Sequence, residues 1–144
     1  MLKQCRGKSV LYLTLNQGYK TVLNFAKKSD FRRFFVIDCF SLKPGGLNPS
    51  IENVVFLPKG WSLGLVGIAI NKGFNLLGRR KVLIIDSLNE LVESADIEVV
   101  AVFLNFLKSN FPDLEIEILA FGRQGKELAK KLDSAINSKS QVGV

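Results

Sequence analysis

The sequence predicts an α/β fold, a three-layer sandwich built around a mostly parallel sheet. Several short segments are apolar without polar alternation, which is typical of strands buried on both faces. Between them lie amphipathic segments of 11–17 residues, long enough for the helices that connect parallel strands. The chain has 144 residues, 47% of them hydrophobic, which suits one core and therefore one domain over residues 1–144.

The first part of the chain alternates in this way. Residues 9–15 (S-V-L-Y-L-T-L) predict a buried strand, and residues 18–28 predict an amphipathic helix that ends in two lysines. Residues 33–38, with the run Phe-Phe-Val-Ile, predict a second buried strand that ends in aspartate. Glycines and prolines in residues 42–50 indicate a loop, and residues 53–57 predict a short strand.

The middle of the chain predicts a helix and the clearest strand. Ser62 is the expected N-cap of a helix that continues through residue 77, and Gly78 is its expected end. Residues 81–86 (K-V-L-I-I-D) then predict a buried strand. A helix on each side of an apolar strand is the pattern of a parallel sheet covered on both faces.

The last part of the chain predicts three further elements and a tail. They are a helix, a strand and an amphipathic helix, over residues 96–110, 114–120 and 124–136. The first of these begins at Ser94 or Asp96, and Pro112 prevents its continuation. Residues 137–144 are expected to be frayed or to form an edge element.

Composition excludes several classes of function. The chain has no histidine, which removes Ser-His and Cys-His nucleophiles and the common imidazole metal sites. The longest stretch without a charge, residues 60–71, is shorter than the roughly 18–20 residues that span a bilayer. Since the start of the chain also lacks a secretory signal pattern, we expect a soluble, cytoplasmic protein. Cys5 and Cys39 have no CxxC spacing, and we expect two free thiols.

The net charge of +7 is unevenly distributed. Residues 1–43 hold nine basic and two acidic residues, residues 44–80 hold four and one, and residues 81–144 hold seven and ten. Such asymmetry is typical either of a basic face for nucleic acid or of a polar protein-interaction surface. The basic residues come as scattered pairs without interleaved aromatic residues, so the sequence favours the interaction surface.

Two short motifs suggest phosphate chemistry. Gly7-Lys8-Ser9 has the ending of a phosphate loop, but Leu2 stands where the first glycine belongs, and a strand follows instead of a helix. We interpret it as a turn that enters the strand. Asp86 follows four apolar residues at a strand end, which is where many nucleotidases hold a magnesium-bound water, so Asp86 is the candidate metal ligand. The alternative is that Asp86, with Ser87, Asn89 and Glu90, starts a helix.

Several segments together resemble the KaiC-like branch of the RecA-superfamily ATPases. They are residues 7–15 (G-K-S-V-L-Y-L-T-L), 35–41 (F-V-I-D-C-F-S), 62–70 (S-L-G-L-V-G-I-A-I) and 81–91 (K-V-L-I-I-D-S-L-N-E-L). The similarity covers about residues 7–119. It implies a P-loop NTPase-type core with Asp86 and Ser87 in a Walker B segment.

The chain departs from that family at the positions that matter for catalysis. The family's phosphate loop precedes the strand that corresponds to residues 10–15, and only nine residues precede Val10 here, so the resemblance implies a core truncated at its N-terminus. The family's paired glutamates, one of them the water-activating base, fall at Asn16 and Gln17. An amide cannot accept a proton as a carboxylate does. Asp86, Ser87, Asn16 and Gln17 are then vestigial nucleotide-binding positions, and we expect no cofactor and no catalytic residue.

The sequence therefore predicts a non-catalytic RecA/KaiC-like domain that acts as a regulatory or protein-interaction module, with a protein partner or as a homo-oligomer and without a membrane. Two alternatives stay open. One is an ATP-binding protein whose site, at the sheet edge with Asn16, Asp38 and Asp86, is completed by another subunit. The other is a basic nucleic-acid-binding module over residues 20–33.

Overall fold

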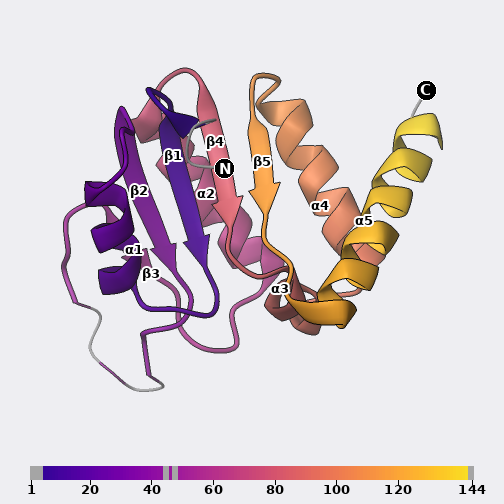
Figure 1. The fold of residues 1–144 in the computed structure, drawn as a ribbon, viewed down its shortest axis with the longest axis horizontal. Helices are drawn as coiled ribbons and strands as arrows, with labels where there is room; N and C mark the ends of the chain where they lie inside the picture. Colours follow the sequence, from indigo (N-terminus) through magenta and orange to yellow (C-terminus); the bar gives the residue numbers. More distant parts are fainter. Residues whose placement is uncertain (1–4, 44–45, 47–48, 143–144) are drawn as a thin grey trace.

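The computed structural model describes residues 5–43, 46 and 49–142, with side chains described up to residue 137. These residues form five strands and five helices (Figure 1). They are β1 (Ser9–Thr14), α1 (Tyr19–Lys27), β2 (Arg33–Asp38), β3 (Val54–Phe56), α2 (Leu63–Leu77), β4 (Lys81–Ile85), α3 (Leu88–Ser94), α4 (Ile97–Asn110), β5 (Glu115–Ile118) and α5 (Gly122–Val142). The predicted α/β fold is confirmed.

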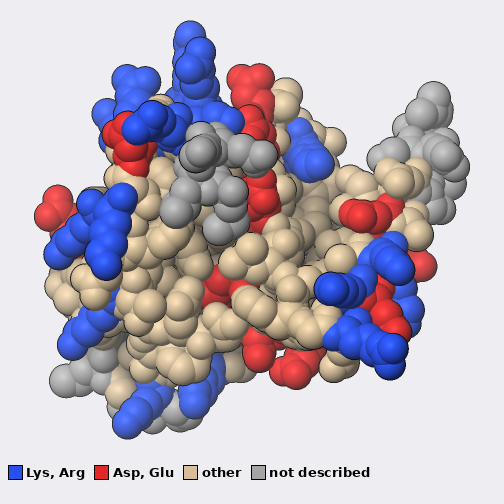
Figure 2. Space-filling model, in the orientation of Figure 1, with Lys and Arg blue, Asp and Glu red and all other residues tan. Residues whose placement is uncertain are grey.

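The strands form one sheet in the order β3-β2-β1-β4-β5, and every neighbouring pair is parallel. Because β2 lies on one side of β1 and β4 on the other, the strand order reverses between β1 and β4. All amino ends of the strands lie at one edge of the sheet and all carboxyl ends at the other (Figure 1). Lys and Arg side chains gather over the amino ends of the strands, at the upper left of Figure 2.

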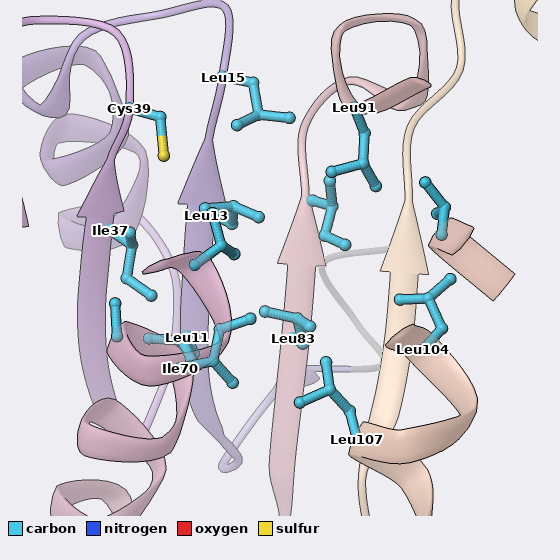
Figure 3. Close-up of a cluster of buried hydrophobic side chains, with 14 of the residues drawn as sticks. Leu11, Leu13, Leu15, Ile37, Cys39, Ile70, Leu83, Leu91, Leu104 and Leu107 are labelled. Carbon is cyan, nitrogen blue, oxygen red and sulfur yellow. The ribbon is translucent and has the colours of Figure 1, made fainter. Parts of the chain in front are cut away.

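Alternation along the strands divides the core into two layers. Leu11 and Leu13 of β1 face the side of the sheet covered by α2 and α4 (Figure 3), while Val10 and Tyr12 face the side covered by α1. The α2 side is the larger cluster and also takes in Leu132 of α5. Helices on both faces of the sheet give the predicted three layers, since burial on both faces is what made the strand segments continuously apolar.

The structure confirms the predicted ends of α2 and the predicted start of α4. The Ser62 hydroxyl accepts a hydrogen bond from the Leu65 amide at 3.2 Å, and Gly78 ends α2 with a φ of 78°. Asp96 is the N-cap residue of α4, one of the two predicted starting points. Gly7, with a φ of 72°, forms the predicted turn before β1, and Cys5 and Cys39 are free and buried, as expected.

The C-terminal part differs from the prediction. α5 extends to Val142, so the prediction of a frayed tail or an edge element is wrong for residues 137–142, and residues 143–144 lie outside the described residues. No glycine or proline occurs between Gly125 and Gly143, so no residue there breaks the helix. The last strand is also shorter than predicted, Glu115–Ile118, because the chain leaves the sheet for the turn that starts α5. No helix in the described part of the chain has both the length and the apolar character needed to cross a membrane.

Candidate functional site

The carboxyl ends of β1, β2 and β4 form the first candidate site, which we call the carboxyl edge. Open parallel sheets bind ligands where the strand order reverses, which here lies between β1 and β4. Asn16 and Gln17 lie in the turn after β1, and Asp86 and Ser87 follow β4 directly. The structure therefore brings all four sequence-predicted residues to the same edge.

Asp86 is buried there and its carboxylate is already bonded. One oxygen lies 2.6 Å from the Thr14 hydroxyl, and the other accepts the Leu15 amide at 2.8 Å. The residue is only 1% exposed. Burial raises the pKa of Asp86, and the hydrogen bonds from Thr14 and Leu15 partly oppose that rise. Asp86 thus joins the ends of two strands far apart in the sequence.

The Thr14 hydroxyl lies between two acceptors. Its oxygen is 2.6 Å from Asp86 Oδ2 and 2.5 Å from the Gln17 carbonyl oxygen. One hydroxyl carries one proton and cannot donate to both acceptors. If Asp86 is protonated, its carboxyl group donates to Thr14 and Thr14 donates to Gln17, which satisfies every group. The pKa of Asp86 is shifted in the same direction, upward, as this arrangement of acceptors would shift it.

The neighbouring predicted residues also have structural partners. The Gln17 side-chain amide donates to the Tyr12 hydroxyl at 2.9 Å, and burial, with the nearby Asp86 carboxylate, raises the Tyr12 pKa to about 12. The Ser87 hydroxyl accepts the Glu90 amide at 3.2 Å as the N-cap of α3. The proposed helix start therefore belongs to Ser87, and Asp86 points across the sheet instead, because its carboxylate satisfies the end of β1.

Asp38, at the end of β2, organises the adjacent loops. Its carboxylate accepts the amides of Tyr19, Phe40 and Ser41 at 2.9, 2.7 and 2.8 Å. The Ser41 hydroxyl donates to it at 2.6 Å. Asp38 is fully buried, so these four bonds offset the loss of hydration of its carboxylate. The carboxylate holds the start of α1 and the turn after β2 in place.

A magnesium ion does not fit this donor set. Magnesium requires oxygen ligands in octahedral geometry, and the oxygens of Asp86 and Asp38 already accept hydrogen bonds from the protein. Among the residues that the structure describes, no group of three or more acidic or cysteine side chains could hold a metal ion. In the same part of the chain, no buried side-chain nitrogen or oxygen lacks a hydrogen-bond partner.

The second candidate site was missed by sequence reasoning. An apolar groove of about 420 Å³ lies between α2 and α4. We call its surface the α2–α4 face, and the large exposed apolar side chains that line it are those of Ile68, Val99, Val102 and Phe106. Ile68 and Phe106 are 56% and 57% exposed. The signal was present in the sequence, because α2 and α4 together contain only three charged residues, fewer than solvent-covered helices carry.

The third candidate site is the opposite, amino edge of the sheet, which we call the basic edge. The basic residues that precede or begin β1, β2 and β4 lie there: Lys8, Arg32, Arg33, Arg79, Arg80 and Lys81. Glu115 pairs with Lys8 at 2.9 Å. Because α1 runs from the carboxyl edge back to the amino edge, Lys20 lies apart from this group. The predicted basic region over residues 20–33 is therefore divided between two edges.

Comparisons of the chain with protein-family models, with curated proteins and with solved structures found no match. The resemblance to KaiC-like ATPases stays a prediction from the quoted segments.

Proposed function

We propose that this chain is a non-catalytic α/β domain, a degenerate relative of KaiC-like ATPases, that acts as a protein-interaction module through its α2–α4 face. The observation that carries the proposal is the half-exposed apolar groove between the two helices. Contiguous apolar surface on a domain of this size marks an interaction site, because burying it removes apolar area from water.

The chemistry of the carboxyl edge supports the non-catalytic part. Phosphoryl transfer needs a phosphate-binding loop, a metal-binding carboxylate and a group that orients or activates the attacking water. Asp86 is bonded to Thr14 and Leu15, and amides occupy positions 16 and 17. A nucleotide site completed by another subunit would first have to break the bonds between Asp86 and the end of β1.

Site-specific cross-linking tests the interaction. Phe106→p-benzoylphenylalanine places a photoreactive group on the α2–α4 face, and Phe121→p-benzoylphenylalanine is the matched control, since Phe121 is comparably exposed but lies at the start of α5. On irradiation in the cells that naturally produce the chain, we expect a discrete cross-linked band from position 106 alone. The absence of that band, or equal bands from both positions, contradicts the proposal.

An ATP hydrolysis assay tests the proposal that the chain is non-catalytic. The purified chain and Asp86→Ala are expected to release phosphate from ATP and magnesium at the same background rate. Turnover by the wild-type chain that Asp86→Ala abolishes would show that the carboxyl edge is catalytic.

A second candidate function is supported by the basic edge. Arg32 and Arg33 lie at the amino end of β2, and Arg79 and Arg80 precede β4, so the two pairs flank the amino end of β1, an arrangement that suits the phosphates of a nucleic acid. Arg79→Glu with Arg80→Glu is expected to weaken binding of a DNA duplex roughly tenfold or more at low salt. The control, Lys126→Glu with Lys130→Glu on α5, has the same charge change. Equal affinities of the two variants, or binding that is insensitive to salt, exclude this function.

A further inference from the structure

A cavity of about 610 Å³ lies at the basic edge, beside the start of β2. Its walls hold the side chains of Arg32 and Arg33 and the rings of Phe31 and Phe34. The two phenylalanines flank the arginine pair in the sequence, so here aromatic and basic residues do interleave, contrary to the expectation from the sequence. The cavity therefore presents cations and aromatic rings to the same ligand.

The two rings are held in place by other aromatic side chains. Phe31 and Phe34 stack on each other, with ring centroids 5.4 Å apart and ring planes 4° apart. Phe25 packs against Phe31 with centroids 6.0 Å apart, and Tyr12 packs against Phe34 with centroids 6.3 Å apart. Both rings of the stack are half-buried, so part of each is accessible from the cavity. Because the rings are already fixed, a planar group that stacks on them costs the protein little side-chain entropy.

The two arginines are available to an anion. Arg32 and Arg33 are exposed, and within the described residues neither forms an ion pair. Arg33 donates a hydrogen bond to the Leu76 carbonyl at 3.0 Å, which fixes its guanidinium group at the end of α2 and leaves further N–H groups for a ligand. The nearby carboxylate of Asp30 pairs with Arg6 at 3.2 Å.

The wall of the cavity leads to the other arginine pair. Leu77, the last residue of α2, lines the cavity, and Arg79 and Arg80 follow within three residues. The Leu77 carbonyl accepts the Ser9 hydroxyl at 2.9 Å, and the Arg80 carbonyl accepts the Ser9 amide at 3.1 Å. This turn is therefore fixed to the start of β1, and the two arginine pairs lie on either side of that strand.

We propose that the cavity and the adjacent arginines bind single-stranded nucleic acid. One unpaired base lies against the rings of Phe31 and Phe34, Arg32 and Arg33 bind its phosphate, and the other arginine pair binds the next phosphates. A paired base is stacked inside its duplex and does not reach rings in a cavity, whereas an unpaired base does. The inference rests on the second candidate function, nucleic-acid binding at the basic edge, and names the form of nucleic acid.

The combination of groups selects this ligand. Aromatic rings alone suit any planar apolar group, and arginines alone suit any anion. A nucleotide unit has both a planar base and a phosphate, and sites for single strands combine basic and aromatic side chains for this reason. Asn53, also in the wall, adds an amide that can hydrogen-bond the edge of a base. Since the arginines extend beyond the cavity, they match the successive phosphates of a strand better than one free nucleotide.

Fluorescence anisotropy tests the inference with a labelled oligodeoxythymidine of about 12 nucleotides and with a duplex of the same length. The wild-type chain is expected to bind the single strand about tenfold or more tightly than the duplex at low salt. Phe31→Leu keeps an apolar side chain but removes the ring, and is expected to weaken single-strand binding about fivefold or more without changing duplex binding. Phe31→Tyr keeps the ring and is expected to bind within about twofold of the wild type.

Two controls match these variants. Phe103→Leu makes the same change at a half-buried ring of α4 and is expected to bind as the wild type does. Arg32→Gln is expected to weaken single-strand binding and to reduce the slope of its salt dependence by roughly 0.7. Lys130→Gln removes the same charge from α5 and is expected to change neither the affinity nor the slope.

Four results overturn the inference. Equal affinities of Phe31→Leu and Phe31→Tyr, or an equal loss with Phe103→Leu, show that the ring does not contact a base. Displacement of the strand by thymidine monophosphate at equal nucleotide concentration identifies a free nucleotide as the ligand. A duplex bound as tightly as the single strand, in a manner that depends on Arg79 and Arg80, overturns the single-strand site and keeps the second candidate function. No binding of either form at low salt overturns both.

Discussion

The carboxyl edge and the α2–α4 face differ in how fully their side chains are satisfied within the fold. The buried carboxylates of the carboxyl edge have hydrogen-bond partners, whereas apolar side chains of the α2–α4 face are exposed to water. At the carboxyl edge, Asp38 accepts four hydrogen bonds, and Asp86 bonds Thr14 and Leu15. At the α2–α4 face, apolar side chains such as those of Ile68 and Phe106 are half exposed. The acidic residues that looked functional in the sequence hold strand ends and loops together, whereas apolar side chains of α2 and α4 stay exposed to solvent.

The physical reason lies in the cost of each arrangement. An unpaired carboxylate inside a protein is strongly unfavourable, so a buried aspartate without a ligand must find its hydrogen bonds within the chain. Exposed apolar area costs roughly 25 cal/mol per Å², which a stable domain tolerates and a binding partner recovers. Substituting residues of each region separately, and measuring the free energy of unfolding, therefore tests this comparison.

The largest expected effect is at Asp38. Asp38→Ala leaves three backbone amides and the Ser41 hydroxyl without their acceptor, and we expect the free energy of unfolding to fall by about 3 kcal/mol or more. Urea denaturation measures this change in the free energy of unfolding. Asp133→Ala, on the exposed side of α5, is the control and is expected to change it by less than about 0.5 kcal/mol. A loss below about 1 kcal/mol for Asp38→Ala would show that the loops do not depend on the carboxylate.

At Asp86 the expected effect depends on the substituent. Asp86→Ala removes the acceptor of the buried Leu15 amide and is expected to cost about 2 kcal/mol. Asp86→Asn keeps an acceptor for Leu15 and supplies a donor to Thr14, so we expect it to cost less than about 1 kcal/mol. Urea denaturation of both variants checks this difference. Equal losses would contradict the bonding described at the carboxyl edge.

The pH dependence of the free energy of unfolding tests whether burial raises the pKa of Asp86. Because burial raises its pKa in the folded chain, the unfolded chain releases this proton first as the pH rises. The contribution of Asp86 is therefore greatest below its unfolded pKa and declines as the pH rises toward its folded pKa. The free energy of unfolding of the wild type, relative to Asp86→Asn, is expected to fall as the pH increases from about 4. A difference that increases with pH would show a carboxylate stabilised in its charged form.

The smallest expected effect on the monomer is at the α2–α4 face. Phe106→Ser removes a half-exposed ring, and we expect the free energy of unfolding of the dilute chain to change by less than about 1 kcal/mol. Leu104→Ala, on the buried side of the same helix, is expected to cost about 2–5 kcal/mol. Thermal unfolding at low concentration compares the two. If Phe106→Ser costs as much as Leu104→Ala, the ring belongs to the core of the monomer.

Much of the fold could be predicted because its signals are local. The runs at β1, β2 and β4 are apolar on both faces because helices cover both faces, and Ser62 and Gly78 mark the ends of α2 through bonds and dihedral angles within a few residues. The end of α5 could not be placed in this way, since no glycine or proline before Gly143 marks where the helix stops.

The sequence also placed Asn16, Gln17, Asp86 and Ser87 at one edge, because the carboxyl ends of parallel strands meet there. It also indicated the helix start at Ser87, but not the hydrogen bonds that Asp86 and Gln17 make. The Thr14 hydroxyl bonded to Asp86 is 72 residues away in the sequence, and no local pattern connects the two. The hydrogen bond between them forms only because β1 and β4 are neighbours in the sheet.

The sequence by itself determined the strands, the helix caps, the asymmetry of charge and the absence of histidine chemistry, since each depends on residue type and spacing along the chain. The tertiary structure decided which carboxylates are consumed by hydrogen bonds and which apolar side chains stay uncovered. Ile68 and Val66 are both apolar residues of α2, yet one is exposed and the other buried. Their difference is set by what lies opposite each side chain, and that depends on how the helices pack against the sheet.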